Sequence, residues 1–183
     1  MSLFKNKLTE QEATADIIYD ITKQSQSSWP SIHNHFKHIY HDRFVIVNEQ
    51  MAIFDLTLAC IAQEMQAVKN LFPKEQAARI EKWIFECINT ENWGKYAIEE
   101  VKKYSESFQN SVNPLAAIPA RLLHKWLDKN IRNFEVETNG AKTGIIDPTL
   151  IISATLVIGF KGRWKQIKDK FELIEGDTSF ENN

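Results

Sequence analysis

The longest regular pattern of apolar positions in the chain lies between residues 43 and 72. Apolar side chains recur there at alternating intervals of three and four residues, at Phe44, Val47, Met51, Phe54, Leu58, Ile61, Met65, Val68 and Phe72. Since an α-helix turns once every 3.6 residues, this spacing predicts one long helix with a continuous apolar face. A second apolar row indicates burial on more than one side, and it consists of Ile46, Ile53 and Cys60. We therefore expect residues 43–72 to form the central helix of a bundle.

Two amphipathic segments precede the central helix. Thr9 and Glu12 form the signature of a capping box, in which each side chain bonds a backbone N–H at the start of a helix. This first helix should end in the serine-rich run at residues 25–28. Pro30 suits the first position of a second helix, because the N–H that proline lacks would have no partner there. The second helix should end at a bend or short break near residues 41–43. The alternative to this break is one uninterrupted helix over residues 30–72.

Prolines mark the boundaries of several helices. Pro73 should end the central helix, whether or not the break is present. Pro119 must kink the helix around it or mark the true start of that helix. The amphipathic pattern predicts further helices over residues 74–89, from 94 to about 110, and from 113 to about 131.

The C-terminal third contains the only clearly non-helical stretch, residues 132–147. Asn139-Gly140 is typical of a two-residue turn, so a small β-hairpin near residues 133–146 and an ordered loop both fit. The β-branched segment 149–160 suits a buried strand or a helix. Helical spacing that continues to Gly176 favours the helix.

These patterns together predict a mainly α fold: a single helical-bundle domain over residues 1–183 with about six or seven helices. Its ends, at about residues 1–7 and 177–183, should be flexible. Hydrophobic residues make up 43% of the chain and charged residues 25%, which is ordinary for a globular protein. With only 6 Gly and 5 Pro, the chain has too few turn residues for a sandwich or barrel.

The charge and the cysteines bear on partners and compartment. A net charge of −2 provides no general attraction to nucleic acid or anionic lipid. Cys60 and Cys87 lie on predicted apolar helix faces, as buried thiols do in a reducing compartment. Residues 1–10 contain no apolar core of signal-peptide length, so we expect a cytoplasmic protein. The apolar segment 149–160 would reach about 18 Å as a helix, short of the roughly 30 Å of a membrane core, so no membrane span is expected.

A histidine cluster is the first candidate for chemistry. His33, His35, His38 and His41 fall within nine residues, next to Asp42. On a helix His35, His38 and His41 follow at intervals of three, so that adjacent histidines can reach one metal ion. Asp42 or a carboxylate from another helix would complete the coordination of this ion. The alternative is a solvated helix face opposite the apolar stripe. The spacing matches no established metal motif.

Two acidic residues inside the central helix are the second candidate. Asp55 and Glu64 interrupt an otherwise apolar run. A buried carboxylate must be paired, protonated or bound to a ligand, so both are candidates to line a ligand cavity between helices. The alternative is that they lie at the edge of the apolar face and reach water or cap a neighbouring helix.

A basic segment near the C-terminus is the third candidate. It contains Lys161, Arg163, Trp164 and Lys165, with aromatic residues interleaved. Gly159-Phe160-Lys161-Gly162 is similar to the GxxG loop of KH domains, a resemblance that covers about a dozen residues and implies binding of single-stranded nucleic acid. KH domains have an apolar residue where Lys165 stands and build the motif on a three-stranded sheet. The alternative is the end of a core helix.

No sequence motif identifies a reaction or a cofactor: the chain has no phosphate-binding loop, dinucleotide fingerprint, Cys-x-x-Cys or nucleophile elbow. Five Trp and 11 Phe provide more apolar surface than a thin bundle buries. The leading expectation is therefore a non-enzymatic interaction or regulatory module that binds a protein partner or a second copy of itself. A metal- or small-ligand-binding bundle and a nucleic-acid-binding protein are the alternatives.

Overall fold

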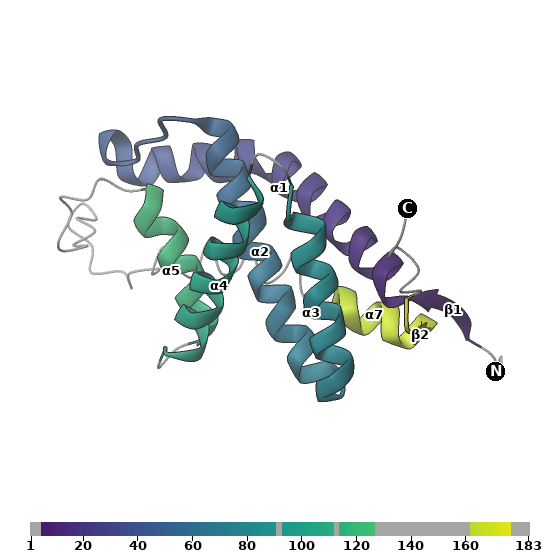
Figure 1. Ribbon diagram of the computed structural model, residues 1–183. Coiled ribbons are helices and arrows are strands. Elements are labelled where there is room, and N and C mark those ends of the chain that lie inside the picture. The colour runs from purple at the N-terminus through teal and green to yellow at the C-terminus, as the bar shows by residue number, and fades with distance from the viewer. Residues whose placement is uncertain (1–4, 91–92, 112–113, 127–161, 177–183) are drawn as a thin grey trace, which may run out of the picture.

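A computed structural model describes residues 5–90, 93–111, 114–126 and 162–176, and the fold of these residues is mainly α-helical, as the sequence predicts. The described part contains six α-helices, one short 3₁₀ turn and two short strands (Figure 1). The hairpin predicted near residues 133–146, the helix or strand at 149–160 and the end at 177–183 lie outside the described residues.

The first helix, α1, begins with the predicted capping box and extends over Glu10–Tyr40. The Thr9 hydroxyl accepts a hydrogen bond from the Glu12 N–H at 3.1 Å. The Glu12 carboxylate accepts hydrogen bonds from the Thr9 N–H at 3.0 Å and from the Thr9 hydroxyl at 2.8 Å, and these two bonds lower the pKa of Glu12. Two backbone N–H groups at the helix start thereby have partners.

The prediction that α1 would end at residues 25–28 and a new helix begin at Pro30 is wrong. The inner face of α1 continues through this region, where Ser25 and Trp29 are both buried, at 0% and 1% exposure. Pro30 lies on the exposed side. Trp29 packs on the ring of Trp126, which in turn contacts Phe36 and Phe44, and burial of this aromatic cluster offsets the cost of a proline inside a helix, about 3 kcal/mol.

The central segment forms α2, Glu49–Leu71, which begins at Glu49 rather than at residue 43. The Asn48 side chain caps this helix by accepting a hydrogen bond from the Met51 N–H at 3.1 Å. Phe44 and Val47 fit the helical spacing but lie in the connection before it, and Val47 is 94% exposed. The predicted break near residues 41–43 is confirmed: a 3₁₀ turn, η1 (His41–Arg43), separates α1 from this connection.

Helix α2 packs against each of the other five α-helices of the described part. These are α1, α3 (Lys74–Ile88), α4 (Gly94–Gln109), α5 (Pro114–Trp126) and α7 (Arg163–Lys170). Pro73 ends α2 as predicted, and α5 continues through position 119, so Pro119 does not mark its start. By length and composition α2 could also cross a membrane, but 72% of the relevant window is buried within the protein.

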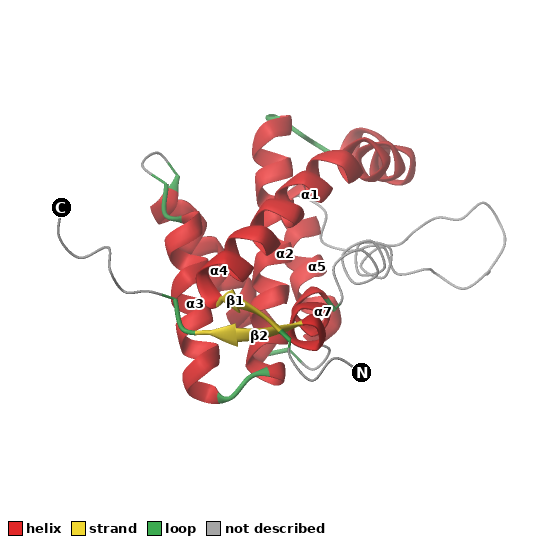
Figure 2. Ribbon diagram, turned by 90° about the vertical axis from the view of Figure 1, so that its right-hand side faces the viewer, coloured by secondary structure: helices red, strands yellow, loops and turns green. Residues whose placement is uncertain are grey.

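The C-terminal described segment differs from its prediction. The predicted helix is present over α7, but its predicted continuation to Gly176 is wrong, because Phe171–Ile174 form a strand, β2. Strand β2 pairs in parallel with β1 (Asn6–Thr9), with Asn6 opposite Phe171 and Thr9 opposite Ile174 (Figure 2). Asn6 and Lys7, expected within a flexible end, are therefore paired.

An ion pair fixes the junction of β1 and α1 to helix α3. The Glu10 carboxylate, 0% exposed, accepts hydrogen bonds from Arg79 Nε and Nη2 at 2.9 and 2.8 Å. Gln76 adds a third at 3.1 Å, and the Glu175 carboxylate lies 3.1 Å from Arg79 Nε. The hydrogen bond to Glu10 raises the pKa of Arg79, which keeps the guanidinium charged.

Candidate functional site

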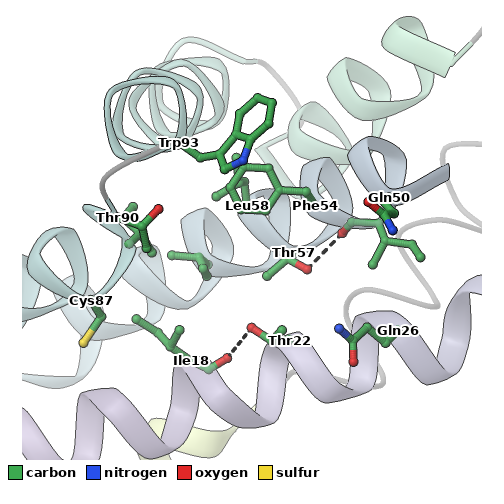
Figure 3. A pocket seen from close by; sticks show the side chains of 13 residues that line it. Ile18, Thr22, Gln26, Gln50, Phe54, Thr57, Leu58, Cys87, Thr90 and Trp93 are labelled. Carbon is green, nitrogen blue, oxygen red and sulfur yellow. Dashed lines mark hydrogen bonds between the residues drawn. The ribbon is translucent and has the colours of Figure 1, made fainter. Parts of the chain in front are cut away.

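A cavity of about 310 Å³ opens between α1, α2 and the connection from α3 to α4 (Figure 3). This volume lies at the lower end of the range of small-molecule sites, about 300–1,000 Å³. Seven of its lining residues are large and apolar: Ile18, Ile53, Phe54, Leu58, Ile61, Ile88 and Trp93. The other six are uncharged and carry a hydroxyl, an amide or a thiol group: Thr22, Gln26, Gln50, Thr57, Cys87 and Thr90. None of these thirteen described residues carries a charge.

Helical spacing explains the two long walls of the cavity. On α1, Ile18, Thr22 and Gln26 follow at intervals of four residues and therefore share one face. On α2, the lining side chains extend from Gln50 to Ile61. Figure 3 shows Gln26 and Gln50 at one end of the cavity and Ile18 and Cys87 toward the other.

The two threonines in the middle of the walls donate their hydroxyl protons in hydrogen bonds to their own helices. Thr22 donates to the Ile18 carbonyl and Thr57 to the Ile53 carbonyl, each at 2.9 Å (Figure 3). Their oxygens retain lone pairs, so toward the cavity each threonine can offer a weak acceptor and a methyl group. The glutamine amides are consequently the main hydrogen-bonding groups of this site.

Trp93 forms an aromatic wall that is half exposed, at 51%. Its ring centroid lies 6.3 Å from that of Phe54 and 6.4 Å from that of Tyr96. The tight connection before α4 requires glycine at position 94, because a Cβ there would lie 2.4 Å from Asn89 Oδ1 and 2.9 Å from the Asn89 backbone. This close approach fixes the position from which Trp93 extends.

Asp55, predicted to line a cavity, belongs instead to a charged network between α2, α4 and α5. Its Oδ1 accepts hydrogen bonds from Tyr96 Oη at 2.6 Å and from Lys125 Nζ at 3.0 Å. Lys125 also forms an ion pair with Glu100, and Lys103 Nζ lies 2.8 Å from the same carboxylate. Asp55 is thus buried and paired, and it is absent from the cavity lining.

The pKa shifts in this network favour its charged form. Burial alone would raise the pKa of Glu100, but hydrogen bonds from Lys103 and Lys125 outweigh it and lower this pKa. Burial likewise opposes the charge of Lys125, whereas its bonds to Glu100 and Asp55 raise its pKa. Burial and the nearby Asp55 raise the pKa of Tyr96 to about 12, so Tyr96 stays a hydrogen-bond donor.

Glu64, the second predicted ligand residue, lies in a different and poorly satisfied environment. It is 3% exposed, and neither carboxylate oxygen accepts a hydrogen bond from any residue that the structure describes. Among the described residues its ion-pair partner is Arg163 of α7, whose Nη1 lies 3.7 Å from Glu64 Oε1 and which also donates to the Gln24 side chain. Burial raises the pKa of Glu64 to about 7, against the opposing effect of Arg163.

The predicted metal ligands do not converge among the described residues. His35, His38, His41 and Asp42 are all exposed, and the ring centroids of His38 and His41 are 6.4 Å apart. Over the described ranges, no group of three or more His, Cys, Asp or Glu side chains could hold a metal ion. The inner member of the cluster, His33, contacts the aromatic rings of Trp29 and Phe44. Metal binding stays a prediction without structural support here.

One described residue of the basic segment, Trp164, belongs to the core. Trp164 is 0% exposed and packs on Phe72 with ring centroids 5.8 Å apart, so it presents no face for stacking on a base. Arg163 faces Glu64 and Gln24, and Lys165 is exposed. Lys161 lies outside the described residues. Nucleic-acid binding stays a prediction, and Trp164, the aromatic residue predicted to take part in it, is a core residue.

Self-association also stays a prediction. In the described part, large apolar side chains with high exposure are Tyr19 at 67%, Val45 at 49%, Val47 at 94% and Trp93 at 51%. Trp93 borders the cavity, whereas the two valines lie in the connection between α1 and α2.

No protein-family model, no curated protein and no solved structure matches the chain. The site is therefore interpreted from its own geometry. Sequence reasoning missed the cavity because it depends on how three helices diverge, which no local pattern encodes. One signal was present: Thr22, Gln26, Gln50 and Thr57 are uncharged polar residues on faces that are otherwise apolar.

Proposed function

We propose that the protein is a non-enzymatic binding protein that holds a small, uncharged and largely apolar ligand in the cavity between α1, α2 and the α3–α4 connection. The observation that carries this proposal is a cavity of about 310 Å³ whose described lining residues are mainly apolar and uncharged. An ionic ligand would lose its hydration there without gaining a counter-charge, which costs several kcal/mol.

The lining also argues against catalysis at this site. Acid–base and nucleophilic mechanisms need a titratable or activated group, such as His, a carboxylate, Lys or a thiolate. Among the described lining residues the one thiol is Cys87, and burial, followed by the nearby Glu86, raises its pKa. The thiol therefore stays protonated at neutral pH, and the hydroxyls of Thr22 and Thr57 are bonded to backbone carbonyls.

Titration with the neutral fluorophore N-phenyl-1-naphthylamine tests this proposal. We expect saturable one-to-one binding by the wild type and a loss of affinity of at least tenfold in Thr22→Trp, whose side chain would fill the cavity from α1. Lys23→Trp is the matched control, because Lys23 is the next residue on α1 but is exposed and outside the lining. Circular dichroism verifies that both variants fold.

Absence of saturable binding to the wild type would contradict the proposal. Equal affinities of Thr22→Trp and Lys23→Trp would also contradict it, since the fluorophore would then bind elsewhere.

A further inference from the structure

The two glutamine amides that line the cavity lie at one of its ends. Ile18, Thr22 and Gln26 are eight residues apart from first to last, so this wall is about 12 Å long. Gln26 and Gln50 are at the same end (Figure 3). A hydrogen bond of 2.6 Å from Trp29 Nε1 to Glu49 Oε1 confirms that this part of α1 lies beside the start of α2.

The opposite end of the cavity contains no amide. Ile18 lies there, together with the Cys87 thiol and the Thr90 hydroxyl (Figure 3). Leu58, Ile61 and Ile88 add apolar side chains to the lining. The threonines between the two ends have donated their protons to their own helices. A ligand that matches this arrangement is an amphiphile, with its apolar chain at the isoleucine end and its polar head at the glutamine end.

The two glutamines select the chemistry of that head. A glutamine amide offers two donors and one acceptor oxygen, so a pair of them can both give and receive hydrogen bonds. A carboxamide head also has both functions, a hydroxyl offers one proton, and a carboxylate only accepts. A carboxylate head would moreover lie close to the Glu49 carboxylate, which is adjacent to Gln50 and held by Trp29.

We propose that the cavity binds an uncharged amphiphile with a carboxamide head, which pairs with Gln26 and Gln50 while its aliphatic chain packs against Ile18, Leu58 and Ile61. This inference rests on the proposed function and specifies its ligand class. Both glutamines are exposed at the cavity rim, so the head remains near solvent and the chain is the part that is buried.

Displacement of bound N-phenyl-1-naphthylamine by octanamide, octanoate and 1-octanol at pH 7.5 tests this ligand class, because the three compounds share one chain and differ in the head. We expect octanamide to displace the fluorophore at a concentration at least tenfold lower than octanoate and severalfold lower than 1-octanol. The double variant Gln26→Met/Gln50→Met should lose about tenfold in octanamide affinity, the equivalent of one or two net hydrogen bonds. The affinity of this variant for the fluorophore is measured directly, and that value is used to calculate its octanamide affinity from the displacement curve.

Gln109→Met/Gln166→Met is the matched control, because both of these glutamines are exposed and lie outside the cavity. It should keep the wild-type preference for octanamide. Octanoate displacing as well as octanamide, or an unchanged preference in Gln26→Met/Gln50→Met, would overturn the ligand class while the fluorophore still reports a binding cavity. Failure of the fluorophore itself to bind would overturn the proposed function, and this inference with it.

Discussion

Asp55 and Glu64 are carboxylates on the same helix, both buried, yet their surroundings have opposite consequences for stability. Asp55 is 7% exposed and accepts hydrogen bonds from Tyr96 and Lys125. Glu64 is 3% exposed and has a cation at 3.7 Å, but accepts no hydrogen bond from the described residues. The comparison shows that two carboxylates buried to a similar degree on one helix differ in the number and the distance of the donors that reach them. For Glu64, burial outweighs the distant cation and raises the pKa.

The largest expected effect comes from removing the cation that two buried carboxylates share. Lys125→Met leaves Asp55 and Glu100 without their common partner, and breaking a buried ion pair in this way costs about 3–5 kcal/mol. Urea unfolding at pH 7.5 should show a free energy of unfolding lower by that amount.

Lys103→Met is the control for Lys125→Met, because Lys103 also pairs with Glu100 but its side chain is 48% exposed. Lys103→Met should lower the free energy of unfolding by less than about 1 kcal/mol. Equal losses in the two variants would show that Lys125 is no more than a surface charge.

The next largest effect should have the opposite sign. Glu64→Gln replaces the carboxyl group with a neutral isostere, and we expect it to stabilise the protein at pH 8. The pKa of Glu64 is raised from its ordinary value of 4.5 to about 7, so the folded state keeps this proton between these two pH values while the unfolded state loses it. The stability that Glu64 contributes is therefore fully present below pH 4.5 and is lost as the pH rises through about 7, by about 3 kcal/mol in total.

Urea unfolding of the wild type and Glu64→Gln at pH 5 and pH 8 measures this difference. The two proteins should be nearly equal at pH 5, and the variant should be more stable by about 2–3 kcal/mol at pH 8. Comparing the two proteins at each pH cancels the pH effects that they share. Asp55→Asn should instead destabilise the protein at pH 8, and the same sign in both variants would refute the contrast between the two carboxylates.

The smallest effect isolates one hydrogen bond of the satisfied carboxylate. Tyr96→Phe removes the 2.6 Å bond to Asp55 but leaves Lys125 in place, so we expect a loss of about 1 kcal/mol. Tyr19→Phe, at a side chain that is 67% exposed, should change the free energy of unfolding by less than half of that. A negligible effect of Tyr96→Phe would mean that Lys125 alone satisfies Asp55.

Helical periodicity predicted the bundle correctly where a strong boundary residue was present. Pro73 marked the end of α2, and Thr9 with Glu12 marked the start of α1. Periodicity failed where polar atoms decide the boundary. Asn48 caps α2 inside the regular apolar pattern, and the buried Ser25 continues α1 through a run that looked like a helix end.

The strand pair could not be predicted, because Phe171 and Ile174 are three residues apart and this interval fits a helix. Their strand conformation depends on a partner near the other end of the chain, β1. The surroundings of the two predicted site residues, Asp55 and Glu64, could not be predicted for the same reason. Asp55 and Glu64 were identified as buried polar residues, but Lys125 and Arg163 come from other helices, and their approach is a tertiary event.

The pairing of β1 with β2 has a consequence for the order in which the protein folds. Because Asn6 lies opposite Phe171, this contact closes a loop of nearly the whole chain, and such contacts form slowly compared with local ones. During synthesis, α1 can form at its own capping box as soon as it emerges from the ribosome. The strand that precedes it must wait, unpaired, until residues 171–174 have been translated.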